Sequence, residues 1–445
     1  MSSPDLIRDD IRPTLVKMTL PMMVGIVSLM LFNLADIYFV SQLGTEPMAA
    51  LAFTFPVTFS VISLAIGFGI GTSAILAKLI GAGRQSEAAL LATDNLMMTL
   101  ILVLVVSIIA HWFMPPLFRL MGASEALQVY ILEYMEVWWF GAVFVVANMV
   151  ANSSLRSRGD TKTPAMIMAA SSALNVMLDP LLIFGWGPVP AMGIRGAALA
   201  SVISWVCVFF CVTHILYHRY QLLVFVRLNV ARVLRHWLQV MKIGLPAALS
   251  NMLTPLAGGI LTALVAQHGA EAVAAFGVGN RLESLSLLAC LALSMTLPPF
   301  VSQNYGAGQI SRVEAAYKGA VKFALVWQFC VFLLLLLLSG WLAGLFADSE
   351  AVRQPLLLWL TIVPLGFGMQ AVIFLSASTL NALHQPIRAM RISILRLFVF
   401  FIPMAWVANY FGGLQAMFIS FVVANTLTSV IAFLWVKKAI AKKAI

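Results

Sequence analysis

The stretch Leu333-Leu334-Leu335-Leu336-Leu337-Leu338 lies inside an apolar run that extends over residues 315–346. A membrane-spanning β-strand would alternate apolar and polar side chains, and this run does not alternate. Only helices and closed barrels satisfy their backbone hydrogen bonds inside a lipid bilayer. The leucine run therefore predicts a membrane-spanning helix.

The rest of the chain resembles this stretch in composition. Of its 445 residues, 62% are hydrophobic and only 10% are charged, which excludes an ordinary soluble domain. Apolar runs of about 20 residues or more follow one another along the chain. They predict an all-α polytopic membrane protein with twelve transmembrane helices, at about 14–42, 50–78, 91–114, 128–154, 164–185, 193–217, 238–267, 273–304, 315–346, 354–382, 387–409 and 412–436.

The chain repeats itself with a spacing of 225 residues. Leu20-Pro21 recurs as Leu245-Pro246, and Gly81-Ala82-Gly83 recurs as Gly306-Ala307-Gly308. The repeat predicts two homologous bundles of six helices each.

A basic stretch separates the two halves. We predict an N-terminal bundle over residues 1–217, a cytoplasmic linker over 218–242 and a C-terminal bundle over 243–445. The linker mixes basic and apolar side chains, so we expect it to lie along the cytoplasmic membrane surface. A regulatory site for acidic lipids is the alternative for this stretch.

The placement of basic residues predicts the orientation. Of the 27 Lys and Arg residues, 23 lie in or beside the termini and the loops after the even-numbered spans. The positive-inside rule then places both termini in the cytoplasm of a multi-pass inner (plasma) membrane protein. The net charge of +10 belongs to membrane loops and does not indicate nucleic-acid binding. The first apolar run is too long for a cleavable signal peptide.

Asp36 lies within the first apolar run and falls opposite Leu261 in the second half. A carboxylate inside a membrane is costly, so one that the duplication does not require indicates function. Asn33 lies three residues earlier on the same helix face. The alternative is that Asp36 is a structural group that locks two helices together.

Two further polar pairs lie four residues apart and therefore share helix faces: Asn148 with Asn152, and Asn175 with Asp179. Together with Asp36, they predict one hydrated pocket in the first half. Two carboxylates in a low-dielectric pocket repel when both are ionised, which indicates a group that takes up and releases a proton. Since a proline follows Asp179, a structural role at a helix irregularity remains open for it.

Pro21 lies about four helical turns before Asp36, and a proline inside a helix kinks it. We predict a hinge at Pro21 that responds to the charge on Asp36. Pro246 repeats the position without an acid, which favours the alternative of a structural kink common to both halves.

Other apparent motifs have structural interpretations. Gly67-Phe68-Gly69-Ile70-Gly71 lies inside an apolar run without a preceding strand, so it predicts close helix packing rather than a phosphate loop. The four cysteines lack metal-ligand spacing. We expect no metal site and no cofactor. Asn280, Glu283 and Gln303 are the candidates for substrate contacts in the second half, with an ion pair or helix-end role as the alternative for Glu283.

The chain resembles the multidrug and toxic compound extrusion (MATE) transporters over essentially its whole length. The matching features are the two halves of six spans, the repeated Leu-Pro and Gly-Ala-Gly motifs, and the acid in the first span. The most specific short signal is the loop Arg156-Ser157-Arg158-Gly159-Asp160-Thr161-Lys162-Thr163-Pro164. Residues 241–268 and 355–383 lack the acids of NorM-like members, so the resemblance is to the DinF-like branch.

The resemblance implies roles for particular residues. Asp36 matches the acid of the first span, and Asn175 and Asp179 match its partners in the fifth. Ser201 is the one candidate for the hydroxyl that sodium-binding relatives use, which favours protons over Na+. The remaining candidates for substrate contact or cavity lining in the first half are Asn33, Tyr38, Asn148, Asn152 and Met168.

The resemblance implies a secondary antiporter that works by alternating access and is not an enzyme. It would export amphipathic, often cationic organic compounds, such as drugs or toxic cations, in exchange for protons. Its other partners would be membrane lipids, with no nucleic acid, and it would act as a monomer. The alternatives are a Na+-coupled exporter and a flippase for lipids or lipid-linked saccharides. A membrane-embedded transferase would need a metal-holding acidic cluster, which the sequence lacks.

Overall fold

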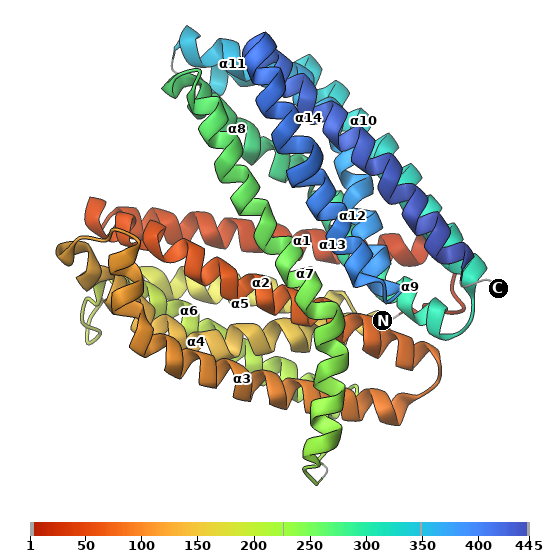
Figure 1. The fold of residues 1–445 in the computed structure, drawn as a ribbon. Helices are drawn as coiled ribbons and strands as arrows, with labels where there is room; N and C mark the ends of the chain where they lie inside the picture. The colour runs from red at the N-terminus through yellow and green to blue at the C-terminus, as the bar shows by residue number, and fades with distance from the viewer. Residues whose placement is uncertain (1–3, 226, 348, 443–445) are drawn as a thin grey trace. The chain divides into compact units, whose positions relative to one another are not determined.

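The computed structural model describes residues 4–225, 227–347 and 349–442. Within these ranges the regular structure is helical, apart from one isolated bridge between Trp186 and Val189. In chain order the helices (Figure 1) are α1 (Ile11–Ser41), α2 (Thr45–Gly81), α3 (Gln85–Leu120), α4 (Glu125–Ser157), α5 (Lys162–Ile183), α6 (Gly193–His218), α7 (Val230–Ala266), α8 (Ala270–Ser286), α9 (Leu288–Gly306), α10 (Ile310–Phe346), α11 (Glu350–Ile362), the 3-10 helix η1 (Val363–Gly366), α12 (Phe367–Ala382), α13 (Pro386–Ile394), the π-helix η2 (Leu395–Phe401) and α14 (Ile402–Ala441).

The prediction of twelve spans is confirmed. Ten helical segments of the described chain are long and apolar enough to cross a membrane, and α8 with α9, bent by 46°, makes an eleventh. The segment Pro386–Ala441 contains the last two predicted spans. It breaks at Gly412 and Gly413, whose backbone is not helical, so its two parts are separate spans.

The chain divides into two compact units. Unit 1 comprises Met1–Pro4 and Leu20–Ala248, and unit 2 comprises Asp5–Thr19 and Leu249–Ile445. The predicted boundaries instead lie at residues 217 and 243, and the predicted outer limits at 1 and 445 lie outside the described residues. The difference arises at α1 and α7. The first part of α1 belongs to unit 2 and the rest of it to unit 1, whereas the first part of α7 belongs to unit 1 and the rest of it to unit 2.

The predicted linker over 218–242 is partly helical. Its second part, from Val230, is the beginning of α7 and belongs to unit 1. Val240 and Ile243 of this helix are buried in the core of unit 1, as is Leu222 from the preceding stretch. Apolar side chains between the basic ones therefore hold the stretch against the bundle.

In unit 1, α4 is the central helix and contacts α2, α3 and α6, while α6 also contacts α5 (Figure 1). The glycines of α2 allow a close approach to α7. A Cβ atom on Gly67 would lie 2.3 Å from the Gly244 carbonyl oxygen, and one on Gly71 would lie 2.5 Å from the Val240 carbonyl oxygen. The prediction of close helix packing at this motif is confirmed.

Unit 2 repeats this architecture around α12, which contacts α9, α10 and α14. The spans that contain α4 and α12 are the fourth of their respective halves. The turns between the second and third spans also agree, because Gly83 and Gly308 both adopt φ of +74°. The sequence repeat is therefore a repeat of backbone conformation.

Candidate functional site

Unit 1 brings three of the predicted polar residues together. Asn175 and Asp179 are buried one turn apart on α5, and Ser201 is buried on α6. In the amide orientation that satisfies both partners, Asn175 donates to Asp179 Oδ2 at 2.9 Å. Its oxygen then accepts from the Ser201 hydroxyl at 3.2 Å and from the Ser201 backbone N–H at 3.1 Å. The α5–α6 contact therefore fixes the amide that holds the carboxylate.

The two carboxylates share this polar region. Asp36 is half-buried on α1, and its charge acts on Asp179. Both charges also act on the buried Tyr134 of α4. The described residues form no ion pair with either carboxylate. Asp179 Oδ1 is buried without a hydrogen-bond partner in the described residues. The region therefore carries two acids and no compensating cation.

Met168 lies at the contact between α1 and α5. A Cβ atom on Gly25 of α1 would lie 3.2 Å from both the Ala165 Cα and the Met168 sulfur. The absence of a side chain at Gly25 lets the helix that carries Asp36 approach α5. Met168 is thereby placed beside the first span, where the resemblance expects a cavity-lining residue.

Asn148 and Asn152 lie on the central helix α4. The Asn148 amide donates to the Trp205 carbonyl oxygen at 2.8 Å, which joins α4 to α6. The Asn152 amide donates to the Asn148 carbonyl oxygen at 2.9 Å. The side-chain oxygens of both residues are buried and have no partner among the described residues. Each asparagine therefore keeps one acceptor available inside unit 1.

Asn33 and Tyr38 are exposed on α1. Asn33 donates to the Leu29 carbonyl oxygen of its own helix at 2.9 Å, and Tyr38 is 61% exposed. Neither has a described hydrogen bond to the pair of carboxylates. Pro21, the predicted hinge, lies inside α1, which continues through it.

The three candidates of the second half lie on two helices of unit 2. Asn280 is exposed on α8, and Gln303 is buried on α9. Glu283 is half-buried on α8 and accepts a hydrogen bond of 2.7 Å from the Gln370 amide on α12. Its partner is therefore a neighbouring helix rather than Arg281.

Sequence reasoning missed the residues that complete this second polar centre. Arg396 on η2 donates through Nε to Asn425 Oδ1 at 3.0 Å, and the Asn425 amide lies 3.5 Å from Gln370 Oε1. Arg396 is among the basic residues predicted to lie in or beside the cytoplasmic loops, but it lies inside the helical segment Pro386–Ala441. An arginine well inside a predicted span was the available signal. Tyr134 was also missed, since nothing in the sequence distinguishes it from a core tyrosine.

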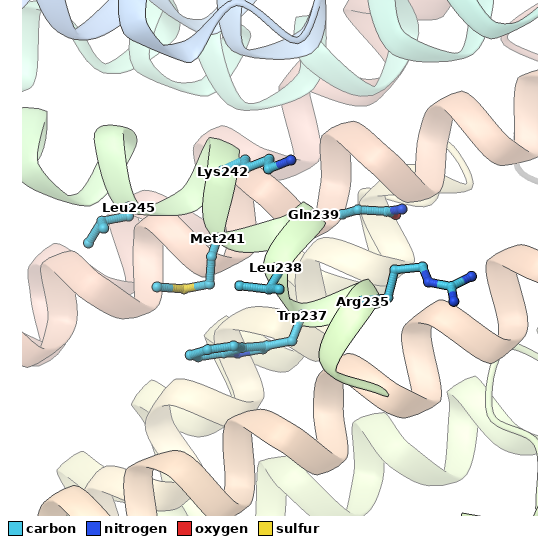
Figure 2. A pocket seen from close by; sticks show the side chains of 7 residues that line it. All are labelled: Arg235, Trp237, Leu238, Gln239, Met241, Lys242 and Leu245. Carbon is cyan, nitrogen blue, oxygen red and sulfur yellow. The ribbon is translucent and has the colours of Figure 1, made fainter. Parts of the chain in front are cut away.

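One further pocket lies along the first part of α7 (Figure 2). Its lining comes from that helix alone: Arg235, Trp237, Leu238, Gln239, Met241, Lys242 and Leu245. Figure 2 shows Trp237 and Met241 pointing away from the side of Arg235 and Lys242. The amphipathic helix is consistent with a position at a membrane surface, and we assign no transport role to this pocket.

Two similar bundles of apolar helices, with polar centres inside their spans, are typical of a secondary transporter. The chain matches the MatE family model over residues 21–181 and 246–407. It therefore belongs to the MATE family of transporters and is not an enzyme.

The chain is similar to known transporters over nearly its whole length. The FAD transporter of Shewanella oneidensis is 39% identical over 94% of this chain and 93% of its own length. The multidrug export protein MepA of Staphylococcus aureus is 26% identical over 94% of this chain and 91% of its own length. The crystal structure of the Vibrio cholerae MATE transporter VcmN in the bent form superposes with a TM-score of 0.92 at 33% identity, and the match covers 97% of this chain and 98% of that one.

Proposed function

We propose that this chain is a proton-coupled antiporter of the cell's inner membrane, with both termini in the cytoplasm, that exports FAD. The relative that is named an FAD transporter carries the substrate assignment, because the identity of 39% extends over 94% of the chain. The pair of Asp36 and Asp179 carries the assignment of the coupling site. We further propose that the protein acts as a monomer and belongs to the DinF-like branch.

The coupling argument rests on charge. Two carboxylates that act on one another without a compensating cation are stabilised when one of them takes up a proton or a metal cation. In the predicted orientation both acids lie in the outer half of their spans, so protons from outside reach them first. Protonation of Asp36 removes its effect on Asp179 and changes the hydrogen bonds of Asn175. Transport then requires only that proton and substrate favour different conformations.

Protons are the proposed ion rather than Na+. The Ser201 hydroxyl, which donates to Asn175, is the one oxygen that the sequence offered as an additional sodium ligand. A sodium ion prefers several oxygen ligands around it, whereas a proton needs one carboxylate oxygen. The unpartnered Oδ1 of Asp179 supplies such an oxygen.

Export of amphipathic cationic drugs is the second candidate function. The unbalanced acids of unit 1 suit a cation, and the relative MepA, 26% identical, is named a multidrug export protein. FAD is an anion with two aromatic ring systems, so the two candidates differ in the sign of the substrate charge.

Inside-out vesicles that contain the protein test both proposals. After an acid-inside gradient is formed, we would add FAD, ethidium or norfloxacin, with and without Na+, to wild type and Asp36→Asn. We expect FAD to trigger proton release without Na+, in wild type alone. A response to the drugs but not to FAD would show that the drugs are the substrates. A response only with Na+ would show that Na+ is the coupling ion. Proton-coupled uptake by Asp36→Asn would overturn the coupling site.

A further inference from the structure

Four spans of unit 2 contribute one polar side chain each to a connected centre: Glu283, Gln370, Arg396 and Asn425. Each lies at least nine residues from either end of its predicted span, near the middle of the membrane. Ionisable groups at this depth are costly and mark substrate or ion pathways in transporters. We therefore expect this centre to have a function in transport.

The charged members of the centre are incompletely satisfied. In the described chain, Arg396 is hydrogen-bonded only through Nε, which leaves its two terminal nitrogens without acceptors. Among the described residues, Glu283 accepts only the bond from Gln370. Each charge acts on the other, but the described residues include no direct ion pair between them. A purely structural network would be expected to close this gap.

Aromatic rings fix the orientation of the guanidinium. Its carbon lies 5.4 Å from the ring centre of Phe374 and 5.7 Å from that of Phe401. Phe401 in turn stacks on Phe421, with ring centres 4.6 Å apart and planes 13° from parallel. Rings beside the guanidinium leave its N–H edges for in-plane acceptors, which is the geometry that binds phosphate through two parallel hydrogen bonds.

Arg396 and Phe401 also lie on a π-helical segment, η2. π-helical turns are rare and occur frequently at functional sites. The wider turn places an arginine and aromatic side chains on one short segment of the bundle.

We propose that Arg396 is a specificity-determining residue that binds a phosphate group of the exported flavin dinucleotide. The rings of Phe374 and Phe401 hold the guanidinium in an orientation that leaves its N–H edges for the phosphate. Glu283, Gln370 and Asn425 position the guanidinium and limit its net charge, so that the phosphate can leave again. This assignment rests on the proposed function, because it requires an anionic aromatic substrate.

Equilibrium binding to the purified full-length protein in nanodiscs tests the assignment. The probes are FAD, FMN and riboflavin, which share a ring system and differ in phosphate, followed by their intrinsic fluorescence. A charge-assisted pair of hydrogen bonds predicts that Arg396→Gln weakens the binding of FAD and FMN by about 10- to 100-fold. Binding of riboflavin should change by less than about threefold, and Arg396→Lys should restore part of the loss.

Arg312→Gln is the matched control. Arg312 also lies over a ring in unit 2, at 5.6 Å from the Phe300 centroid, but donates to Asn304 and to backbone oxygens near the N-terminus. It should leave the preference for FAD over riboflavin unchanged. An equal loss for all three flavins in Arg396→Gln, or no loss, would overturn the assignment.

The vesicle assay separates this assignment from the proposed function. Binding of FMN and FAD that depends on Arg396, without export of FAD, would support the site and overturn the function. Export of FAD with unchanged binding in Arg396→Gln would support the function and overturn the site. If wild type bound no phosphorylated flavin, the assignment to Arg396 would also be overturned.

Discussion

Unit 1 and unit 2 share a duplicated scaffold but differ in the charge of their polar centres. Unit 1 holds Asp36 and Asp179, and no basic side chain of the described residues forms an ion pair with either of them. Unit 2 holds Glu283 together with Arg396, whose charges act on each other. One proton brings the first centre closer to neutrality, whereas the opposite charges of the second already balance.

The duplication accounts for neither centre. At the repeat spacing of 225 residues, Asp36 falls opposite Leu261, and Glu283 falls opposite Thr58. The helices and the turns are common to both halves, but the ionisable groups are not. The scaffold therefore supplies two similar bundles, and single substitutions supply the coupling and the selectivity that we propose. Four predictions test this division of roles.

The largest effect is expected for Asp36→Asn compared with Glu283→Gln. Asp36→Asn removes the group that we propose exchanges a proton, so proton release on substrate addition should fall by about 100-fold or more, as for other essential proton-transfer groups. Glu283→Gln should retain proton coupling even if substrate affinity changes. Dye-reported proton movement in inside-out vesicles measures both. Equal loss of coupling in the two variants would show that the two units do not differ in their role in proton coupling.

The second prediction compares how each unit holds the beginning of a long helix. In unit 1, the buried Asp94 accepts from Arg232 of α7 at 2.8 and 3.1 Å and contacts His236 at 2.8 Å. In unit 2, Arg312 donates to the Asp9 carbonyl oxygen at 2.6 Å, just before α1. One unit therefore anchors the crossing helix through an acid and the other through a base.

Asp94→Ala should destabilise the protein more than Arg312→Ala. Loss of Asp94, whose side chain is 2% exposed, leaves two basic partners that are 25% and 18% exposed without their acceptor, at a cost of about 2 kcal/mol. Loss of Arg312 leaves Asn304 still donating to the Leu6 carbonyl oxygen, so about 1 kcal/mol is expected. Thermal unfolding in nanodiscs gives the order. The reverse order would contradict the stronger anchor that we assign to Asp94.

The third prediction concerns Ser201. Ser201→Ala removes the hydroxyl that orients the Asn175 amide but keeps the backbone N–H that donates to the same oxygen. We expect a loss of about 1 kcal/mol, or roughly fivefold in the rate of coupled transport. Thr426→Ala in unit 2 is the control, since its hydroxyl bonds only within its own helix. A Ser201→Ala variant with full activity would show that α6 does not contribute to the coupling site.

Local sequence signals predicted the fold more fully than the site. The twelve spans follow from runs of apolar residues, and the contact of α2 with α7 follows from the glycines at 67 and 71. The start of α7 at Val230 was missed because basic residues obscure its apolar face in the sequence. The bend between α8 and α9 was also missed, since no proline or glycine lies at the break at Leu287.

Only some residues of the two polar centres could be predicted, because their signals in the sequence differ. Asp36 and Asp179 are unusual for their surroundings, so polarity alone identifies them. Arg396 was grouped with loop residues by its nearness to Arg388 and Arg391, although it lies deeper in the span. Gln370 and Asn425 acquire their meaning only from contacts between spans, which spacing along one helix does not reveal.

The smallest effect is expected at the two prolines of the crossing helices. α1 passes from unit 2 to unit 1 at Leu20, and α7 passes from unit 1 to unit 2 after Ala248. Pro21 and Pro246 therefore lie where each helix changes unit, which explains why the repeat retains both. If the kinks are only structural, Pro21→Ala and Pro246→Ala should alter transport to the same small extent.

The hinge hypothesis predicts a difference between them. Only α1 carries an acid beyond its proline, so only in α1 can a change of charge be passed to the crossing point. We expect Pro21→Ala to slow coupled transport by about threefold and Pro246→Ala to leave it within about 1.5-fold, since a proline kink influences helix bending more than it influences the fold. Transport rates normalised to the amount of folded protein measure both. Equal rates for the two variants would assign Pro21 the same static role as Pro246, and the charge on Asp36 would then have to act through α5 alone.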